Sequence, residues 1–123
     1  MGVFLILASY ENLRRGAKMG KTADWRIKDF ISKVRKKYDL TNAILFGSRA
    51  RGDNLNDSDY DVILVSSDFN GKFFTKRIAD MYQFWNYYPI DIEPICYTPA
   101  EFEIKKKQIG IVSQAIKEGI NLL

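Results

Sequence analysis

Histidine is absent from the 123 residues, and cysteine occurs once, as Cys96. Without histidine the chain can form neither a Ser-His-Asp or Cys-His catalytic group nor a histidine zinc site. A single cysteine rules out a disulfide within the chain and a cysteine metal cluster, which fits a reducing, cytoplasmic compartment. Any chemistry must therefore use carboxylates, lysine, arginine, tyrosine or a bound metal.

Long apolar runs are also scarce. Residues 1–8 are apolar, but this stretch is much shorter than the roughly 20 residues of a membrane span, and no basic residue precedes it. We therefore expect neither a signal peptide nor an anchor, and no association with a membrane. A second methionine, Met19, precedes the first clear helix. Residues 1–20 are accordingly interpreted as an extension outside the functional core, and residues 21–123 as one domain.

Charge is distributed unevenly along the chain. The net charge is +4, yet residues 41–68 carry five acidic and only two basic residues. The basic remainder could attract nucleic acid or nucleotide phosphates, and it is equally compatible with an ordinary solvated surface. No second domain that could hold a long template is evident, which argues against nucleic acid as the partner.

Apolar periodicity outlines an alternation of helices and strands. Two prolines in the alternating segment 89–97 indicate a strand at the edge of a sheet. We predict an α/β fold of the α+β type, with a small mixed sheet of three or more strands flanked by helices. The predicted elements are a helix at 22–38, strands at 42–46 and 60–65, a helix at 72–87, a strand at 89–97, a helix after a Thr98 cap and a helix at 111–118. The residues expected to face inward from the helix at 72–87 are Phe73, Ile78, Met81, Tyr82 and Trp85.

A glycine and a serine, Gly47 and Ser48, stand where the first strand ends and a short helical turn is expected to begin. Amide N–H groups at the start of a helical turn lack partners, so they can donate to phosphate oxygens. Glycine allows the backbone to approach a phosphate closely, and the serine hydroxyl can donate one more hydrogen bond. The pair is therefore a candidate phosphate site.

Two aspartates, Asp59 and Asp61, open the second strand two positions apart. Alternate residues of a strand point to the same face, so the two carboxylates can converge on metal ions. Magnesium prefers carboxylates, water and phosphate oxygens as ligands, and it would relieve the repulsion between the two charges. Asp91, on the third strand, completes the cluster if that strand lies beside the second. The alternative is purely structural, with Ser48 capping a helix and Asp59 ending a polar loop.

The stretch from Leu45 to Val65 resembles the minimal nucleotidyltransferases of the DNA polymerase β-like superfamily, and the order of elements agrees from Lys21 onward. The resemblance implies that Gly47 and Ser48 hold a triphosphate. It further implies that Asp59 and Asp61 bind two magnesium ions and that a third acid on a later strand binds one of them.

Asp91 is our choice for this third acid by its position and facing, with Glu93 as the competitor on the same face. Arg49 and Arg51 are candidate phosphate contacts, and each is equally well explained as a surface residue or as a partner of a nearby aspartate.

The expected activity is metal-dependent transfer of a nucleoside monophosphate, AMP by preference, from a triphosphate such as ATP to an acceptor hydroxyl, with release of pyrophosphate. Members of this family often pair with a small helical protein in toxin–antitoxin modules, so the acceptor could lie on such a partner. The competing hypothesis is an antitoxin or regulatory binding subunit with the same fold and little catalysis. Modification of an aminoglycoside-like small molecule is a third possibility, and a homo-oligomer is compatible with all three.

Overall fold

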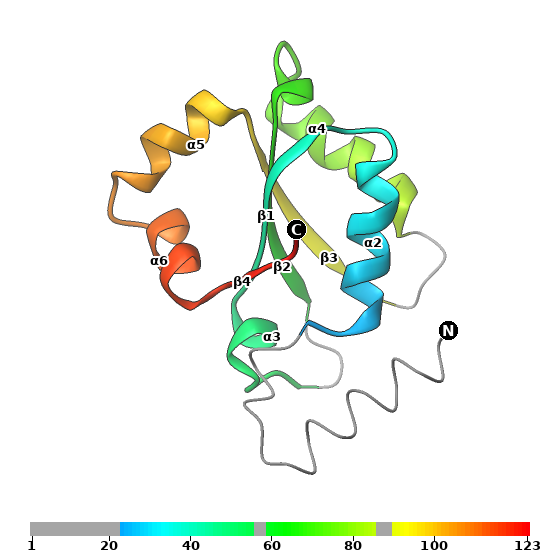
Figure 1. Ribbon diagram of the computed structural model, residues 1–123, viewed down its shortest axis with the longest axis vertical. Coiled ribbons are helices and arrows are strands. Elements are labelled where there is room, and N and C mark those ends of the chain that lie inside the picture. The colour runs from blue at the N-terminus through cyan, green and yellow to red at the C-terminus, as the bar shows by residue number, and fades with distance from the viewer. Residues whose placement is uncertain (1–22, 56–58, 86–89) are drawn as a thin grey trace.

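The computed structural model describes residues 23–55, 59–85 and 90–123. A four-stranded mixed sheet forms the middle layer, with strand order β3-β2-β1-β4. Helices α2 and α4 cover one face of this sheet and α5 and α6 cover the other, while the short α3 lies at one end (Figure 1). The predicted fold class is confirmed. The proposed extension at residues 1–20 lies outside the described residues.

The sheet is organised around β2 (Tyr60–Ser66), which is buried along almost its whole length. It pairs antiparallel with β1 (Leu40–Phe46) and parallel with β3 (Ile92–Tyr97). β3 is an edge strand, as its prolines predicted, and Pro94 lacks the amide N–H that a further strand would need. A short strand that the sequence pattern did not indicate, β4 (Ile120–Asn121), pairs with β1 at the opposite edge.

Helix α2 (Trp25–Arg35) begins at Asp24, whose carboxylate accepts hydrogen bonds from the amides of Arg26 and Ile27 at 2.9 and 3.4 Å. This cap satisfies two amides that have no partner inside the helix. The helix is shorter at both ends than the predicted 22–38. Its buried residues recur at helical spacing and are Ile27, Phe30, Ile31 and Val34.

Helix α4 (Phe74–Met81) continues into the single 3₁₀ turn η3 (Tyr82–Phe84) rather than as the uniform helix predicted over 72–87. Phe73 precedes the helix in an extended conformation and is 85% exposed, and Tyr82 is 57% exposed. Both had been expected to face inward. A 3₁₀ turn advances about 120° per residue instead of 100°, which turns Phe84 and Trp85 toward the core and Tyr82 away from it.

Helix α5 (Pro99–Lys106) starts with a capping box in which Thr98 and Glu101 exchange hydrogen bonds. Helix α6 (Ile111–Glu118) ends before Gly119, as predicted. A Cβ atom on Gly119 would lie 2.8 Å from the carbonyl oxygen of Leu45, so only glycine lets the chain turn from α6 into β4 against β1.

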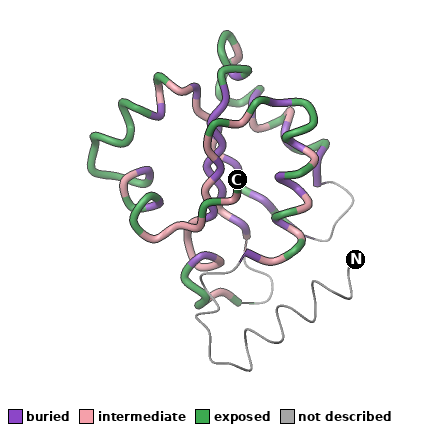
Figure 2. The backbone as a smooth tube through the Cα atoms, in the orientation of Figure 1, coloured by how far each residue is buried: buried purple, intermediate pink, exposed green. Residues whose placement is uncertain are grey.

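The two faces of the sheet carry separate hydrophobic clusters, and Figure 2 shows the buried residues concentrated along the strands and the inner sides of the helices. The larger cluster lies between the sheet and α2, α4 and η3, where Phe30 packs edge to face against Phe84 and Trp85. The smaller cluster joins the sheet to α5 and α6 through Ile63, Val65, Phe102, Val112 and Ala115. Within the described residues, no helix is long and apolar enough to cross a membrane.

Arg77 is a buried cation that ties α4 to β3 and α5. Its guanidinium donates to the carbonyl oxygens of Lys72 and Cys96, each at 3.0 Å, and to Oε1 of Glu101 at 2.6 Å. The hydrogen bond from Arg77 holds the pKa of Glu101 below its ordinary value. A lowered pKa in the folded state means that this contact stabilises the fold above the ordinary pKa of glutamate and is lost as the pH falls through the lowered value.

We expect Glu101→Gln to lower the free energy of unfolding at pH 7 by about 1–2 kcal/mol, because a half-exposed charge partner of a buried arginine is lost. The difference should shrink as the pH falls through the lowered pKa of Glu101. Urea unfolding at pH 7 and pH 3.5 measures both. Glu103→Gln is the matched control, since the exposed pair of Glu103 with Lys106 should contribute less than about 0.5 kcal/mol. Equal losses in the two variants would contradict the assignment.

Candidate active site

The end of β1 turns sharply at Gly47 into the four-residue helix α3 (Ser48–Arg51). Gly47 has φ 74° and ψ −158°, a conformation that is open essentially to glycine alone. Its carbonyl oxygen accepts from the amides of Ala50 and Arg51, each at 3.1 Å. The predicted strand, turn and short helix are confirmed, and they place the Ser48 side chain at the first position of the helix.

Gly47 lies directly against the carboxylate of Asp61. A Cβ atom at residue 47 would collide with Oδ2 of Asp61 and would lie 3.3 Å from its Cγ. The antiparallel register of β1 and β2 brings them together, because Phe46 pairs with Asp61. The candidate phosphate turn and one candidate metal ligand, 14 residues apart in the sequence, therefore share one small site.

The parallel register between β2 and β3 brings further carboxylates to the same end of the sheet. Asp61 is paired with Glu93, and the amide of Tyr60 donates to the carbonyl oxygen of Asp91 at 2.9 Å. Alternate residues share a face of a strand, so the side chains of Asp59 and Asp61 lie on one face of β2 and those of Asp91 and Glu93 on the corresponding face of β3.

The electrostatics of this cluster reflect crowded negative charge. Burial raises the pKa of Asp61, and the nearby charge of Asp59 raises it further. Hydrogen bonding to Asp59 raises the pKa of Glu93, and burial and contact with Asp61 act in the same direction. Three carboxyl groups thus interact closely in the protein alone. Such groups normally share a proton or bind a cation.

The sequence favours Asp91 over Glu93 as the third acid, but in the structure Glu93 also lies beside the paired aspartates. Glu93 pairs with Asp61 in the register of β2 and β3, and its pKa responds to both aspartates, whereas Asp91 accepts the hydrogen bond from the Tyr60 amide at its backbone carbonyl. Among the described residues, no three carboxylates stand in the arrangement of a preformed metal site. The metal-binding roles of Asp59, Asp61 and Asp91 therefore stay predictions.

The two arginines of α3 differ in their contacts. Arg51 pairs with Asp53 at 3.2 Å and lies 3.9 Å from Glu118 at the end of α6. The sequence leaves open whether Arg51 contacts phosphate or pairs with a nearby aspartate, and the structure shows the aspartate pair. The charge of Arg51 also offsets part of the rise in the pKa of Asp61. Arg49 places its guanidinium carbon 4.3 Å from the centre of the Tyr60 ring.

A hollow of about 670 Å³ lies beside the acidic cluster at the free edge of β3. Its walls are apolar residues of α4, η3 and β3, and Glu93 is the one carboxylate among the described residues that line it. Glu93, whose pKa responds to Asp59 and Asp61, is therefore shared by the lining of this hollow and the acidic cluster. Tyr82, left exposed by the 3₁₀ turn, forms part of the wall.

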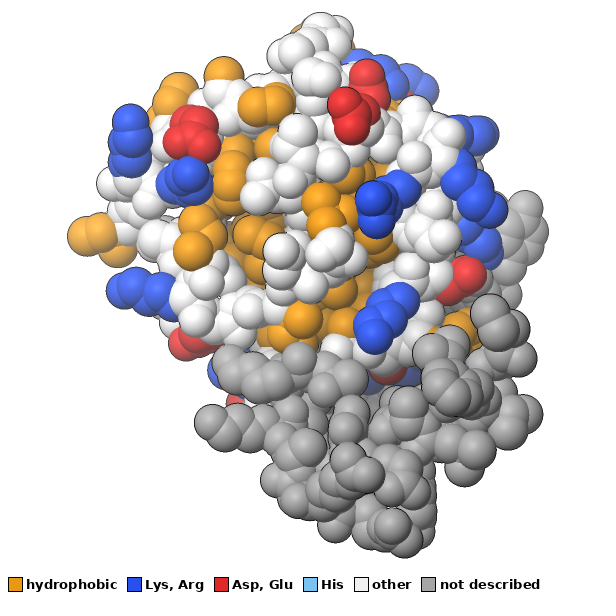
Figure 3. All heavy atoms as spheres, viewed as in Figure 1, with side chains coloured by type: hydrophobic (Ala, Val, Ile, Leu, Met, Phe, Trp, Pro, Cys, Tyr) orange, Lys and Arg blue, Asp and Glu red, His pale blue; other side chains and the backbone are white. Residues whose placement is uncertain are grey.

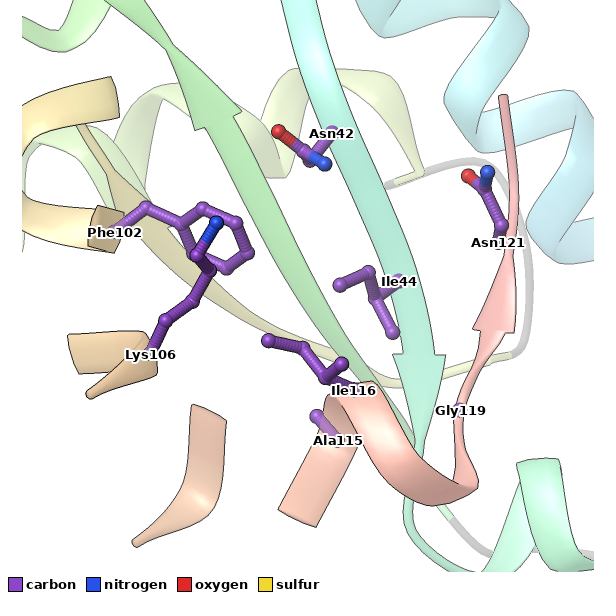
Figure 4. Close-up of a pocket in the computed structure, with 8 residues that line it drawn as sticks. All are labelled: Asn42, Ile44, Phe102, Lys106, Ala115, Ile116, Gly119 and Asn121. Carbon is purple, nitrogen blue, oxygen red and sulfur yellow. The ribbon is translucent and has the colours of Figure 1, made fainter. Parts of the chain in front are cut away.

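A second cavity, of about 490 Å³, opens between β1, β4, α5 and α6 (Figure 4). Phe102, Ile44 and Ile116 give it an apolar lining, and Asn42 and Asn121 lie at its rim. Hydrophobic side chains also gather at the surface between α5–α6 and α2 (Figure 3). Because none of the eight lining residues is acidic, this cavity is not the carboxylate site.

Comparison with known proteins identifies the family. The profile of the nucleotidyltransferase domain family matches residues 27–120. A candidate nucleotidyltransferase from Sulfolobus solfataricus shares the fold, with a TM-score of 0.56 and 22% identity over 92% of this chain and 84% of that chain. A toxin–antitoxin structure with AMP-PNP superimposes with a TM-score of 0.53 and 16% identity over 78% of this chain and 72% of that chain.

No curated protein matches the sequence. The family match covers most of the chain, and it includes the Gly47 turn, both paired aspartates and β3. The chain therefore belongs to the nucleotidyltransferase domain family, as a minimal member of the DNA polymerase β-like superfamily.

Proposed function

We propose that this protein is a metal-dependent nucleotidyltransferase that moves AMP from ATP to an acceptor hydroxyl. The observation that carries the proposal is the direct packing of Gly47 against Asp61. It places a turn suited to phosphate oxygens beside carboxylates suited to a cation, which is the arrangement that transfer at the α-phosphate needs.

The residues at the site fit divalent metal ions. All the candidate ligands are carboxylates, which are the side chains that magnesium prefers. Burial raises the pKa of Asp61 and hydrogen bonding to Asp59 raises the pKa of Glu93, which supports a site of crowded negative charge that a cation would stabilise. Asp59, Asp61 and Asp91 would hold two magnesium ions. Bound metal would supply charge neutralisation at the phosphates and would lower the pKa of the acceptor hydroxyl.

The chain's own groups would position the reactants. The Gly47 turn and the Ser48 hydroxyl would hold the β- and γ-phosphate oxygens by hydrogen bonds, and Arg51 lies close enough to Asp61 to add positive charge beside them. Asp91, on the side away from the phosphate turn, would accept the proton of the acceptor hydroxyl at a carboxylate oxygen.

The hollow at the free edge of β3 is the proposed approach for the acceptor. Its lining includes Glu93 and is otherwise mainly apolar, so it favours a hydroxyl carried by a protein side chain over one on a polar sugar-like molecule. The fold similarity to a toxin–antitoxin structure with AMP-PNP supports ATP as the donor and a partner protein as the acceptor. The competing function is a binding subunit that holds such a partner without modifying it.

Labelling separates these two functions. The protein is incubated with ATP labelled at the α-phosphate, Mg²⁺ and purified candidate acceptors, namely a neighbouring small helical protein and a panel of hydroxylated small molecules. Covalent label on one acceptor, with matching pyrophosphate release, supports transfer. A stable complex with the helical protein and no label under any condition would instead establish the binding subunit.

The third acid can be identified by paired isosteric variants. We expect Asp91→Asn to lower the transfer rate by about 10³-fold, because it removes both a proposed metal ligand and the proton acceptor. Glu93→Gln should lower it by only about tenfold, because its longer side chain is proposed to support Asp59 and Asp61 without holding metal. Rates of pyrophosphate release at saturating ATP and Mg²⁺ make the comparison. The reverse order of effects would assign the role to Glu93.

A further inference from the structure

Tyr60 stands between the two aspartates in sequence but points the opposite way. Its side chain enters the larger hydrophobic cluster and is 1% exposed, while Asp59 and Asp61 face the acidic site. Contacts that hold the Tyr60 ring in place therefore also hold the segment of β2 that carries both carboxylates.

Three contacts hold the Tyr60 side chain. Its hydroxyl donates to Oδ2 of Asp24, the residue that caps α2. Two guanidinium groups lie over its ring, with the Cζ atoms of Arg49 and Arg26 at 4.3 and 5.6 Å from the ring centre. Arg26 in turn donates to Oδ2 of Asp24 at 3.3 Å.

These contacts join segments that are far apart in the sequence. Asp24 and Arg26 belong to the start of α2, Arg49 to the helix that follows the phosphate turn, and Tyr60 to the start of β2. The amide of Tyr60 also donates to the carbonyl oxygen of Asp91 at 2.9 Å, so the same residue helps to set the register of β3 beside β2. Four segments thus meet at Tyr60, and three of them, α3, the start of β2 and the start of β3, bear proposed site residues.

The hydrogen bond and the ring contacts have separable effects. A buried hydroxyl that donates to a carboxylate is a strong, directional restraint, so it sets the position of the strand. A cation over an aromatic face restrains the plane of the guanidinium, so it sets the position of Arg49 and of α3. Catalysis is sensitive to errors of about 1 Å in the placement of reacting groups.

We infer that Tyr60 is a positioning residue for the proposed transferase site: its hydroxyl on Asp24 holds the aspartate pair in register with Asp91, and its ring holds Arg49 and the phosphate turn. This inference rests on the proposed function for its kinetic consequences. The coupling of the segments does not require any activity and can be measured on the protein alone.

The test uses three single variants, the Tyr60→Phe/Asp24→Ser double variant and one control. Tyr60→Phe removes the hydroxyl and keeps the ring, Asp24→Ser removes its acceptor and keeps a helix cap, and Tyr60→Leu removes hydroxyl and ring together. Tyr38→Phe is the control, since Tyr38 is another core tyrosine whose hydroxyl contacts Lys72, away from the site.

Amide hydrogen exchange comes first, on the protein without ligand. We expect exchange at residue 60 to be at least tenfold faster in Tyr60→Phe and in Asp24→Ser, and no faster still in the double variant, because both remove one interaction. Exchange at Gly52, whose amide donates to Ser48, should accelerate only in Tyr60→Leu. Unchanged exchange in all three variants would overturn the inference, whether or not the protein proves to be an enzyme.

Ligand and rate measurements then separate positioning from simple stability. With AMP-PNP and Mg²⁺ as the probe, Tyr60→Phe should bind within twofold of wild type, and Tyr60→Leu about tenfold more weakly. Pyrophosphate release from ATP should fall about tenfold in Tyr60→Phe and Asp24→Ser at temperatures where both are folded, and not in Tyr38→Phe. If Tyr60→Phe and Asp24→Ser lowered the melting temperature but left the rate of pyrophosphate release unchanged, Tyr60 would have only a structural role and the inference would be wrong. A wild type that neither binds AMP-PNP nor turns over ATP would refute the proposed function and leave the exchange result standing.

Discussion

Asp61→Asn should abolish nucleotidyl transfer while leaving the fold at least as stable as wild type. The expected loss is at least about 10³-fold in the transfer rate, or roughly 4 kcal/mol of transition-state stabilisation, because the substitution removes a proposed metal ligand from beside the phosphate turn. Asp59→Asn should have the same effect. Pyrophosphate release and transfer of labelled AMP measure the loss.

The stability expectation follows from the raised pKa of Asp61. Burial and the charge of Asp59 make the folded protein hold a proton on this carboxyl group more tightly than the unfolded chain does. The contribution of Asp61 to stability therefore falls as the pH rises from its ordinary pKa of 3.8 through its raised pKa in the folded protein. At pH 7 the ionised carboxylate of Asp61 destabilises the fold. Asparagine is neutral at every pH, so the free energy of unfolding without metal should be unchanged or higher by up to about 1 kcal/mol.

Asp68→Asn serves as the control for this prediction. Asp68 is an exposed aspartate in the 3₁₀ turn after β2 (Ser67–Phe69), at the other end of the strand, where an asparagine can still accept the hydrogen bond from the Asp39 amide. Asp68→Asn should leave both the transfer rate and the free energy of unfolding unchanged.

An Asp61→Asn protein that keeps transfer within tenfold of wild type would refute the proposed metal site. One that is destabilised by more than about 2 kcal/mol would show that the carboxylate has a structural partner instead.

Gly47→Ala should be nearly as damaging to activity, and unlike Asp61→Asn it should also destabilise the protein. The conformation at Gly47 costs a residue with a side chain about 1–3 kcal/mol. The added methyl group would also collide with Oδ2 of Asp61 and push the carboxylate away from the turn. We expect at least a 10²-fold lower transfer rate and at least tenfold weaker binding of AMP-PNP with Mg²⁺.

Gly71→Ala separates the local collision from backbone strain. Gly71 also has a positive φ, of 78°, but a Cβ atom there would meet nothing within 4 Å. Urea unfolding should show a smaller loss of stability than for Gly47→Ala, and the transfer rate should be unchanged. If the two variants had equal effects on the transfer rate, the contact between Gly47 and Asp61 would have no special role.

Local patterns in the sequence predicted much of the fold, because the residues that determine these features are close together. The Thr98 and Glu101 capping box, the end of α6 at Gly119 and the edge position of β3 all depend on residues within a few positions of one another. The turn at Gly47 was predicted for the same reason.

What the sequence did not predict depends on long-range geometry. Strand β4 has only two residues, and it exists because Ile120 and Asn121 pair with β1. The contact of Glu93 with Asp59 and Asp61 follows from strand register, which alternation alone does not determine. The bond between Tyr60 and Asp24 spans 36 residues, and a tyrosine between two candidate ligands resembles any other core residue of a strand.

The edge strand β3 also determines how copies of this protein can associate. The bond from the Tyr60 amide to Asp91 turns the backbone groups of alternate residues, 91 and 93, toward β2, so those of Ile92, Pro94 and Cys96 point outward. Pro94 has no amide to donate, and Arg77 already occupies the carbonyl oxygen of Cys96. A second sheet therefore cannot extend along this edge, which protects an exposed strand from fibre-like aggregation. Any dimer through this edge has to rest on side chains rather than on a shared sheet.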